Sequence, residues 1–108
     1  MKLTKNYARR LEKLADEATV DCYNEEEVFA GWACAIEDNL PLPLKCSVLG
    51  EEAMLVAVET DDSGTAVLGV VRRGGKKLRI PVQDVEPLSK HVKGLEWLDA
   101  YRHWLGVK

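Results

Sequence analysis

Acidic side chains are concentrated in the middle of this 108-residue sequence. The segment 16–62 holds 13 of the 18 acidic residues, and Lys45 is the one basic residue it contains out of 15 in the chain. The flanking segments carry the remaining 5 acidic and 14 basic residues. Clustered carboxylates repel one another unless a cation or the N-terminus of a helix stabilises them. Cation binding is therefore the first chemistry that the residue types indicate.

Several of these acids lie at the two ends of one expected helix, 25–38. Asp21 and Glu25 stand at its start, and Glu37 and Asp38 stand at its end. The two ends of a straight helix of this length are about 15–20 Å apart, so one ion cannot contact both directly. Glu37 and Asp38 oppose the helix dipole, and free carbonyl groups at a helix end supply further oxygen atoms. Carboxylates in that position are expected if a cation compensates them.

Local structure accounts for part of the acidic segment. Asn24 followed by Glu27 approximates a capping box, and glutamates in a first helical turn complement the helix dipole. Asp61 and Asp62, followed by Ser63 and Gly64, have the composition of a turn.

Other chemistry finds little support. An EF-hand loop beginning at Glu59 would need a bidentate glutamate at its twelfth position, where Val70 stands, and it would need flanking helices in place of strands. The motifs of serine hydrolases and zinc peptidases are absent, which predicts that the protein is not an enzyme. The cysteines are odd in number, and their spacing with the two histidines matches no zinc motif. They are interpreted as small buried hydrophobic residues, and they are Cys22, Cys34 and Cys46.

A basic segment offers a second functional hypothesis. It surrounds the expected hairpin turn Gly74-Gly75 and consists of Arg72, Arg73, Lys76, Lys77 and Arg79. Such a surface is typical of modules that bind a protein or nucleic acid. Nucleic acid is the less favoured partner, because the chain has a net charge of −3 and its strands lack aromatic residues for base stacking. A basic edge that discourages aggregation between strands is the alternative interpretation.

The elements that must position these residues follow from periodicity. Helices are expected over 4–18, with Thr4 as N-cap, over 25–38, ending before two prolines, and over 95–105. The segment 19–23 is expected to be extended. Strands are expected at 44–49, 54–59, 66–71 and 78–82, with Pro81 at an edge or terminal position. The fold class is therefore α+β: a small SH3-like bent sheet or partly open barrel of about four to five strands, packed with two N-terminal helices and one C-terminal helix.

Length and composition agree with this architecture. A chain of 108 residues, 46% hydrophobic and 31% charged, is expected to form one domain over residues 1–108. No apolar run approaches the roughly 20 residues that cross a bilayer, and no signal-peptide core follows Met1. We therefore expect a cytoplasmic protein that does not contact membranes.

Three sequence blocks carry a family resemblance. They are Val20-Asp21-Cys22-Tyr23-Asn24-Glu25-Glu26-Glu27, Gly31-Trp32, and Ile36-Glu37-Asp38-Asn39-Leu40 before Pro41. Together with the region around Pro81 and the final helix, they resemble the CcbP-type calcium-binding proteins of cyanobacteria, which are not EF-hand proteins. The resemblance covers about 19–105, with residues 1–18 as an additional N-terminal helix.

The resemblance implies a calcium-binding protein without catalytic activity that acts as a calcium buffer or sensor. The acids that match the family's motif positions become the metal candidates: Asp21, Glu25, Glu37 and Asp38. Calcium is then the expected ligand, with an affinity in the micromolar to millimolar range. A protein partner at the basic hairpin remains the alternative, and calcium binding does not exclude it.

Overall fold

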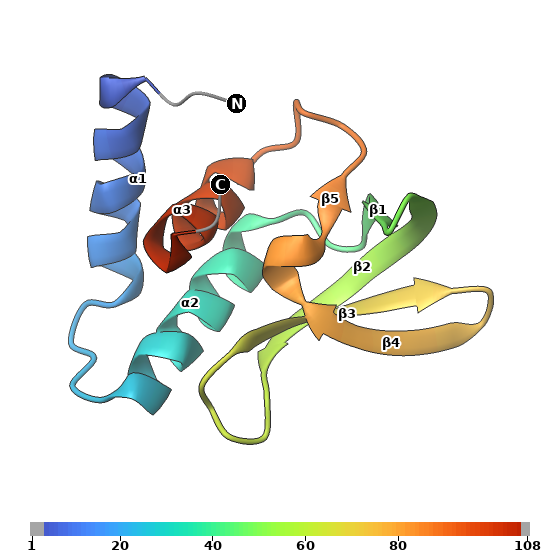
Figure 1. Ribbon diagram of the computed structural model, residues 1–108, viewed down its shortest axis with the longest axis horizontal. Coiled ribbons are helices and arrows are strands. Elements are labelled where there is room, and N and C mark those ends of the chain that lie inside the picture. The colour runs from blue at the N-terminus through green and yellow to red at the C-terminus, as the bar shows by residue number, and fades with distance from the viewer. Residues whose placement is uncertain (1–3, 107–108) are drawn as a thin grey trace.

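The computed structural model describes residues 4–106, which form three helices and a five-stranded antiparallel sheet (Figure 1). The elements are, in chain order, α1 (Lys5–Ala18), α2 (Glu25–Asn39), β1 (Leu44–Val48), β2 (Glu51–Thr60), β3 (Val67–Arg73), β4 (Lys76–Pro81), a 3-10 turn (Val82–Asp84), β5 (Glu86–Pro87) and α3 (Leu95–Leu105). The α+β class and the placing of the helices are confirmed. The sheet has the order β4-β3-β2-β1-β5 and is open, so it does not close into a barrel.

Side-chain caps begin the first two helices where the sequence predicts them. The Thr4 hydroxyl accepts a hydrogen bond from the Tyr7 amide at 3.1 Å, and Asn24 accepts one from the Glu27 amide at 2.9 Å. The Glu27 carboxylate in turn accepts from the Tyr23 amide at 3.0 Å and from the Asn24 side-chain amide at 3.2 Å, so it returns to the residues at and just before the N-cap. The extended conformation expected for 19–23 is wrong. The chain turns there, and Asp21 adopts a φ of 59°.

The turn at 19–23 lets α1 and α2 pack closely. A Cβ atom added at Gly31 in α2 would lie 2.3 Å from the carbonyl oxygen of Ala18, the last residue of α1. Only glycine fits at such a distance, since no side-chain carbon lies that close to a backbone oxygen. The chain therefore has to reverse between Ala18 and Glu25, and this requirement prevails over the strand propensity of the intervening residues.

The sheet is built from hairpins. β3 and β4 meet at Gly74 and Gly75, whose positive φ angles of 56° and 80° suit a two-residue turn. β4 is an edge strand and ends at Pro81, as its lack of an N–H group predicts. β5 forms the opposite edge by pairing with β1.

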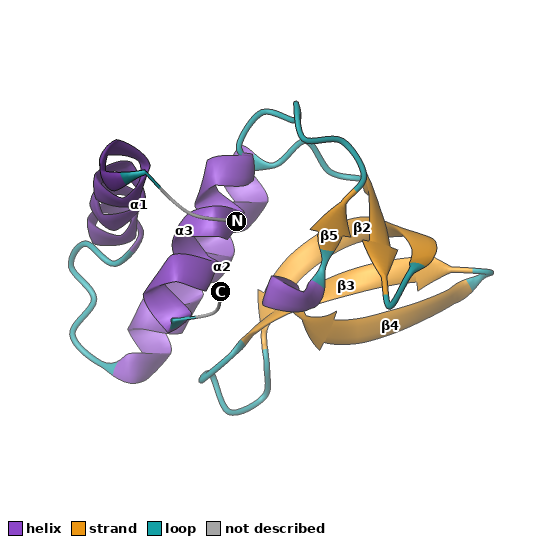
Figure 2. Cartoon of the chain, turned by 45° about the horizontal axis from the view of Figure 1, so that its top comes forward, coloured by secondary structure: helices purple, strands orange, loops and turns teal. Residues whose placement is uncertain are grey.

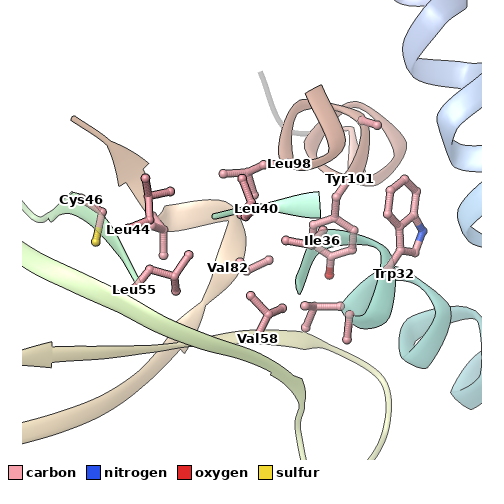
Figure 3. Packing of buried hydrophobic residues seen from close by; sticks show 14 of the residues in the cluster. Trp32, Ile36, Leu40, Leu44, Cys46, Leu55, Val58, Val82, Leu98 and Tyr101 are labelled. Atoms are coloured by element: carbon pink, nitrogen blue, oxygen red, sulfur yellow. The ribbon is translucent and has the colours of Figure 1, made fainter. Parts of the chain in front are cut away.

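One hydrophobic core joins the helices to one face of the sheet (Figure 3). Trp32 and Ile36 of α2 are fully buried, as is Leu55 of β2. The Trp32 and Tyr101 rings make an edge-to-face contact with their centroids 5.3 Å apart, which ties α2 to α3. The helices lie together on one side of the sheet (Figure 2): α2 packs against β2 and β3, and α1 packs on α2 and α3.

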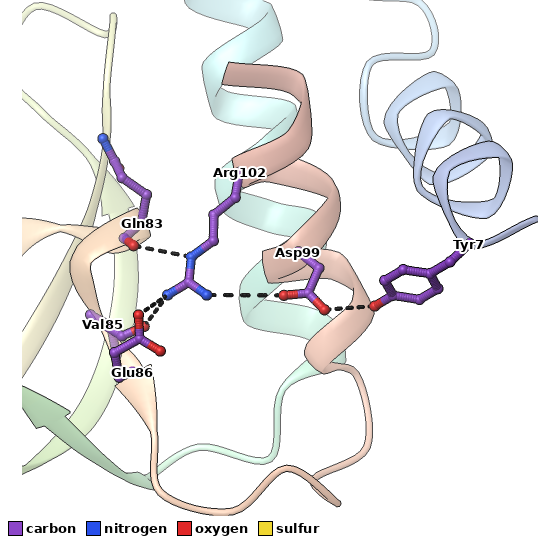
Figure 4. Close-up of polar contacts among 6 residues, drawn as sticks. All are labelled: Tyr7, Gln83, Val85, Glu86, Asp99 and Arg102. Carbon is purple, nitrogen blue, oxygen red and sulfur yellow. Dashed lines mark hydrogen bonds and ion pairs between the residues drawn. The ribbon is translucent and has the colours of Figure 1, made fainter. Parts of the chain in front are cut away.

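Polar contacts fix α3 between α1 and the sheet (Figure 4). The guanidinium of Arg102 donates to the carbonyl oxygens of Gln83 and Val85, just before β5. On the other side of α3, the Tyr7 hydroxyl donates to the Asp99 carboxylate at 2.6 Å. Burial, together with this bond, raises the pKa of Tyr7 above its ordinary value. Among the helices of residues 4–106, none is both long and apolar enough to span a bilayer.

Candidate metal site

The four acidic metal candidates lie at opposite ends of α2. Asp21 is in the turn before the helix, and Glu25 is the first helical residue. Glu37 and Asp38 lie in the last turn. The twelve residues from Glu25 to Glu37 correspond to about 18 Å along the helix axis, so the structure does not bring the four together around one ion.

The acids at the start of α2 are engaged in local structure. Three glutamates in the first turn lie at the positive end of the helix dipole, and one of them, Glu27, also accepts the Tyr23 amide. Asp21 and Glu25 are exposed. This end of the helix already has partial positive charge to stabilise carboxylates, so a bound cation is not needed to explain them.

The turn between β2 and β3 packs against this same end of α2. A Cβ atom at Gly64 would lie 3.1 Å from Cγ of Glu26, which shows how closely the two segments approach. Asp61 in that turn accepts hydrogen bonds from the Ser63 hydroxyl and the Thr65 amide, both at 2.9 Å. The Ser63 hydrogen bond, together with bonds from backbone amides, lowers the pKa of Asp61. The sequence predicted a turn here but not its position beside α2.

Glu37 has a structural role that its position in the sequence does not reveal. Its Oε2 atom accepts a hydrogen bond from the Val58 amide at 2.8 Å. β1 pairs with β2 only as far as Leu55, opposite Leu44, so the later residues of β2 have no strand partner on that side. Glu37 supplies an acceptor to this open edge. A backbone donor therefore stabilises the Glu37 carboxylate, so Glu37 does not need a cation to explain its position, and its role as a ligand stays a prediction.

Backbone oxygens at the end of α2 lack their helical donors. The carbonyl of Glu37 would normally accept the amide of residue 41, but Pro41 has no N–H. The carbonyl of Asp38 would accept the amide of Leu42, which instead donates to the Leu40 carbonyl at 2.9 Å. Two carbonyl oxygens therefore lie next to the Glu37 and Asp38 carboxylates without the usual partners.

A shallow groove of about 220 Å³ runs between α2 and the second half of β2. Glu37 and Glu59 line it, along with Thr60 and Cys34. Glu59 forms an ion pair with Arg79, but the last turn of α2 contains no basic residue. Within residues 4–106, Asp38 forms no ion pair. The C-terminal end of α2 therefore combines acidic side chains, carbonyls that lack their helical donors and the negative end of the dipole.

No ready-made metal cluster exists among the described residues: at no point do three or more His, Cys, Asp or Glu side chains come close enough to hold an ion. This finding rules out, for residues 4–106, the zinc site considered from the three cysteines and His91 or His103. The burial expected for the cysteines is confirmed for Cys46 and wrong for Cys34, which is exposed. Calcium also accepts carbonyl and water oxygens, so a site with one or two acids fits its chemistry.

The basic hairpin forms as predicted, and its five cations divide into two groups. Arg73 pairs with Glu51, and Arg79 pairs with Glu59. The other three are exposed and form no ion pair with any residue that the structure describes; they are Arg72, Lys76 and Lys77.

Comparison with known proteins decides the family. A family model described by calcium binding, that of the CcbP proteins, matches residues 12–105. The chain belongs to the CcbP family of calcium-binding proteins. Family membership confirms the resemblance seen in the sequence blocks around α2, and calcium is the ligand by which this family is described.

Two solved structures share the fold. A crystal structure of CcbP from Anabaena has a TM-score of 0.75 at 19% sequence identity, and the match covers 100% of this chain and 97% of that one. A structure of a calcium-binding protein in its calcium-binding form has a TM-score of 0.69 at 17% identity, with 98% and 99% covered. No curated protein matches the chain. At these identities the two structures show that the whole architecture is shared.

Proposed function

We propose that this protein binds calcium without catalysing a reaction, as a buffer or sensor, and that the ion binds at the C-terminal end of α2. The family match over residues 12–105 is the observation that carries the proposal of calcium binding. Asp38 and Glu37 are the proposed carboxylate ligands. Their backbone carbonyls, which lack helical donors within residues 4–106, and solvent supply further oxygens, since calcium takes six to eight.

Four features favour this end of α2 over the other. Its carboxylates lie at the negative end of the helix dipole, where a cation is stabilised and a second anion is not. No basic side chain is present in the last turn to neutralise them. The Val58 amide occupies only Oε2 of Glu37, which leaves Oε1 as a potential ligand atom. Glu59, across the groove, is near enough in the fold to line the same space.

Asp21 and Glu25 are the candidates for a second, weaker site at the start of α2. The observation in their favour is the packing of the β2–β3 turn, with Asp61 and Asp62, against this end of the helix. Against them stands the dipole, whose positive end repels a cation. The end of α2 is therefore the preferred calcium site and its start the weaker candidate, and one titration experiment can distinguish the two sites.

The absence of a preformed cluster in residues 4–106 predicts a modest affinity. An ion at Asp38 has to order exposed side chains, and that ordering costs conformational entropy. Sites of this kind bind calcium in the micromolar to millimolar range, where sensors and extracellular modules are found. A sensor role agrees with a micromolar affinity, whereas a buffer role would call for tighter binding, because cytosolic calcium buffers bind in the nanomolar range.

Isothermal titration with calcium, repeated with magnesium as competitor, tests the proposal. The paired variant Glu37→Gln with Asp38→Asn should weaken calcium binding by about tenfold or more, since it removes both carboxylates. Glutamine can still accept the Val58 amide, so the fold is retained. The pair Asp21→Asn with Glu25→Gln should change affinity less than about threefold.

A matched control removes two acids elsewhere. Glu12→Gln with Asp84→Asn changes the net charge by the same amount, in α1 and in the 3-10 turn. Equal weakening in this control would mean that only overall charge matters. Weakening confined to the Asp21 and Glu25 pair would move the site to the start of α2. A wild-type protein that shows no binding heat at millimolar calcium would overturn the function itself.

A further inference from the structure

The face of the sheet away from the helices carries a row of cations. In β1, Lys45 is exposed between the buried residues Leu44 and Cys46, so it points away from the core. The strand register places Lys45 opposite Met54, Met54 opposite Arg72, and Arg72 opposite Lys77. Residues directly opposite each other share a face of the sheet. We call these four residues the cationic row.

The row crosses four neighbouring strands. Adjacent strands are about 4.8 Å apart, so its three intervals span about 14 Å. Beside it is a hollow of about 220 Å³, lined by Lys45, Met54 and Arg72, with Glu52 as the one acid. The row therefore combines an apolar centre, Met54, with cations on both sides.

The charges of the row are unfavourable for the isolated protein. Arg72 and Lys77 lie directly opposite each other, and the next pair along the hairpin, Arg73 and Lys76, is also of like charge. Like charges in directly opposed positions destabilise a sheet. Glu51 relieves the second pair by binding Arg73, but within residues 4–106 no acid pairs with Lys45, Arg72 or Lys77. An external anion would relieve the repulsion between Arg72 and Lys77.

Protection of a sheet edge does not explain the row. Charges that prevent aggregation are useful on edge strands, and β4, which carries Lys77, is an edge strand. Lys45 and Arg72 lie on β1 and β3, which are interior strands in the order β4-β3-β2-β1-β5. Their charges face solvent from the middle of the sheet, where no edge needs protection.

We propose that the cationic row docks an acidic segment of a partner protein, with an apolar side chain over Met54 and carboxylates against Lys45, Arg72 and Lys77. An acidic peptide fits better than nucleic acid, because β1 to β5 contain no aromatic side chain on which a base could stack. The apolar centre also suits a peptide side chain rather than a phosphate backbone. This surface is separate from the proposed calcium ligands.

Fluorescence anisotropy with a labelled 14-residue peptide of glutamate and leucine tests the inference. The full-length protein should bind it, and Lys45→Glu with Arg72→Glu and Lys77→Glu should weaken binding by about tenfold or more. A neutral version of the triple variant, with glutamine at all three positions, should give a smaller loss in the same direction. Circular dichroism checks that both variants fold.

A matched triple variant distinguishes the row from overall charge. Arg9→Glu, Lys13→Glu and Lys93→Glu alter three exposed cations outside the sheet and change the net charge equally. Binding within about twofold of wild type is expected. A loss equal to that of the row variant would overturn the proposal.

The apolar part of the proposal has its own test. Met54→Ser should weaken binding of the glutamate and leucine peptide but leave binding of a glutamate and serine peptide of equal charge unchanged. Two further outcomes would overturn the choice of partner. One is tighter binding of a 12-nucleotide single strand with the same dependence on the row. The other is self-association in sedimentation that the row variant abolishes, which would make a second copy of this chain the occupant.

Discussion

The two ends of α2 carry the same kind of side chain in opposite circumstances. At the start, Glu27 completes a cap with Asn24, and the helix dipole stabilises the neighbouring glutamates. At the end, the dipole opposes Glu37 and Asp38, Pro41 removes a donor, and the carbonyls beside them lack their helical donors. Acidic residues therefore indicate a cation site more strongly at the end of α2, where the Val58 amide occupies one oxygen of Glu37 and Asp38 forms no ion pair within residues 4–106.

The packing of α1 against α2 at Gly31 provides the largest expected effect. Gly31→Ala places a Cβ atom 2.3 Å from the Ala18 carbonyl, so α1 and α2 must separate. Overpacking of this kind should lower the free energy of unfolding by about 2 kcal/mol, measured by urea denaturation. Calcium affinity of the folded fraction should not change. Unaltered stability would show that α1 can shift without cost.

Two substitutions of Glu37, at the end of α2, separate its effect on stability from its effect on calcium affinity. Glu37→Ala leaves the Val58 amide without its acceptor and should cost about 1–2 kcal/mol in unfolding free energy. Glu37→Gln keeps an acceptor and should cost less, yet both variants should weaken calcium binding. If Glu37→Gln bound calcium as wild type does, Glu37 would serve the fold alone.

The cap at the start of α2 gives a smaller effect on stability and none on calcium. Asn24→Ala removes the acceptor for the Glu27 amide and should cost about 1 kcal/mol, measured by thermal unfolding. Asn24→Ser retains a capping oxygen and serves as the control. Lower calcium affinity in the alanine variant alone would link the start of α2 to the ion.

The smallest effect concerns pH. The Ser63 hydroxyl holds the pKa of Asp61 below its ordinary value, so the folded state is favoured while Asp61 is ionised. This contribution is present above the unfolded pKa and is lost as the pH falls through the lower folded pKa. Ser63→Ala should raise the pKa of Asp61, measured by carboxyl carbon NMR. An unchanged pKa would show that the backbone amides suffice.

Local signals in the sequence predict most of the fold. Thr4 and Asn24 mark where helices begin, Pro41 follows the end of α2, and Gly74 marks the turn between β3 and β4. These signals act over a few residues, which is why they are readable. The turn at 19–23 was missed because the close approach at Gly31, a contact between helices, overrides local propensity.

The site is less predictable than the fold. Periodicity tells which face of α2 is buried, but it does not tell which strand lies beside Glu37. The bond to Val58 joins residues 21 positions apart and depends on where β1 stops pairing with β2. The packing of α2 beside β2 also forms the groove that Glu37 shares with Glu59. It likewise places the exposed Cys34 in that groove.

A crystal structure of the protein grown with calcium would show where the ion binds. We expect an ion at the C-terminal end of α2, with Asp38 and Glu37 oxygens at about 2.3–2.6 Å, the range for calcium. Backbone carbonyls of the same turn and water should complete the coordination. An ion bound instead beside Asp21 and Glu25, or no ion at millimolar calcium, would contradict the proposed site.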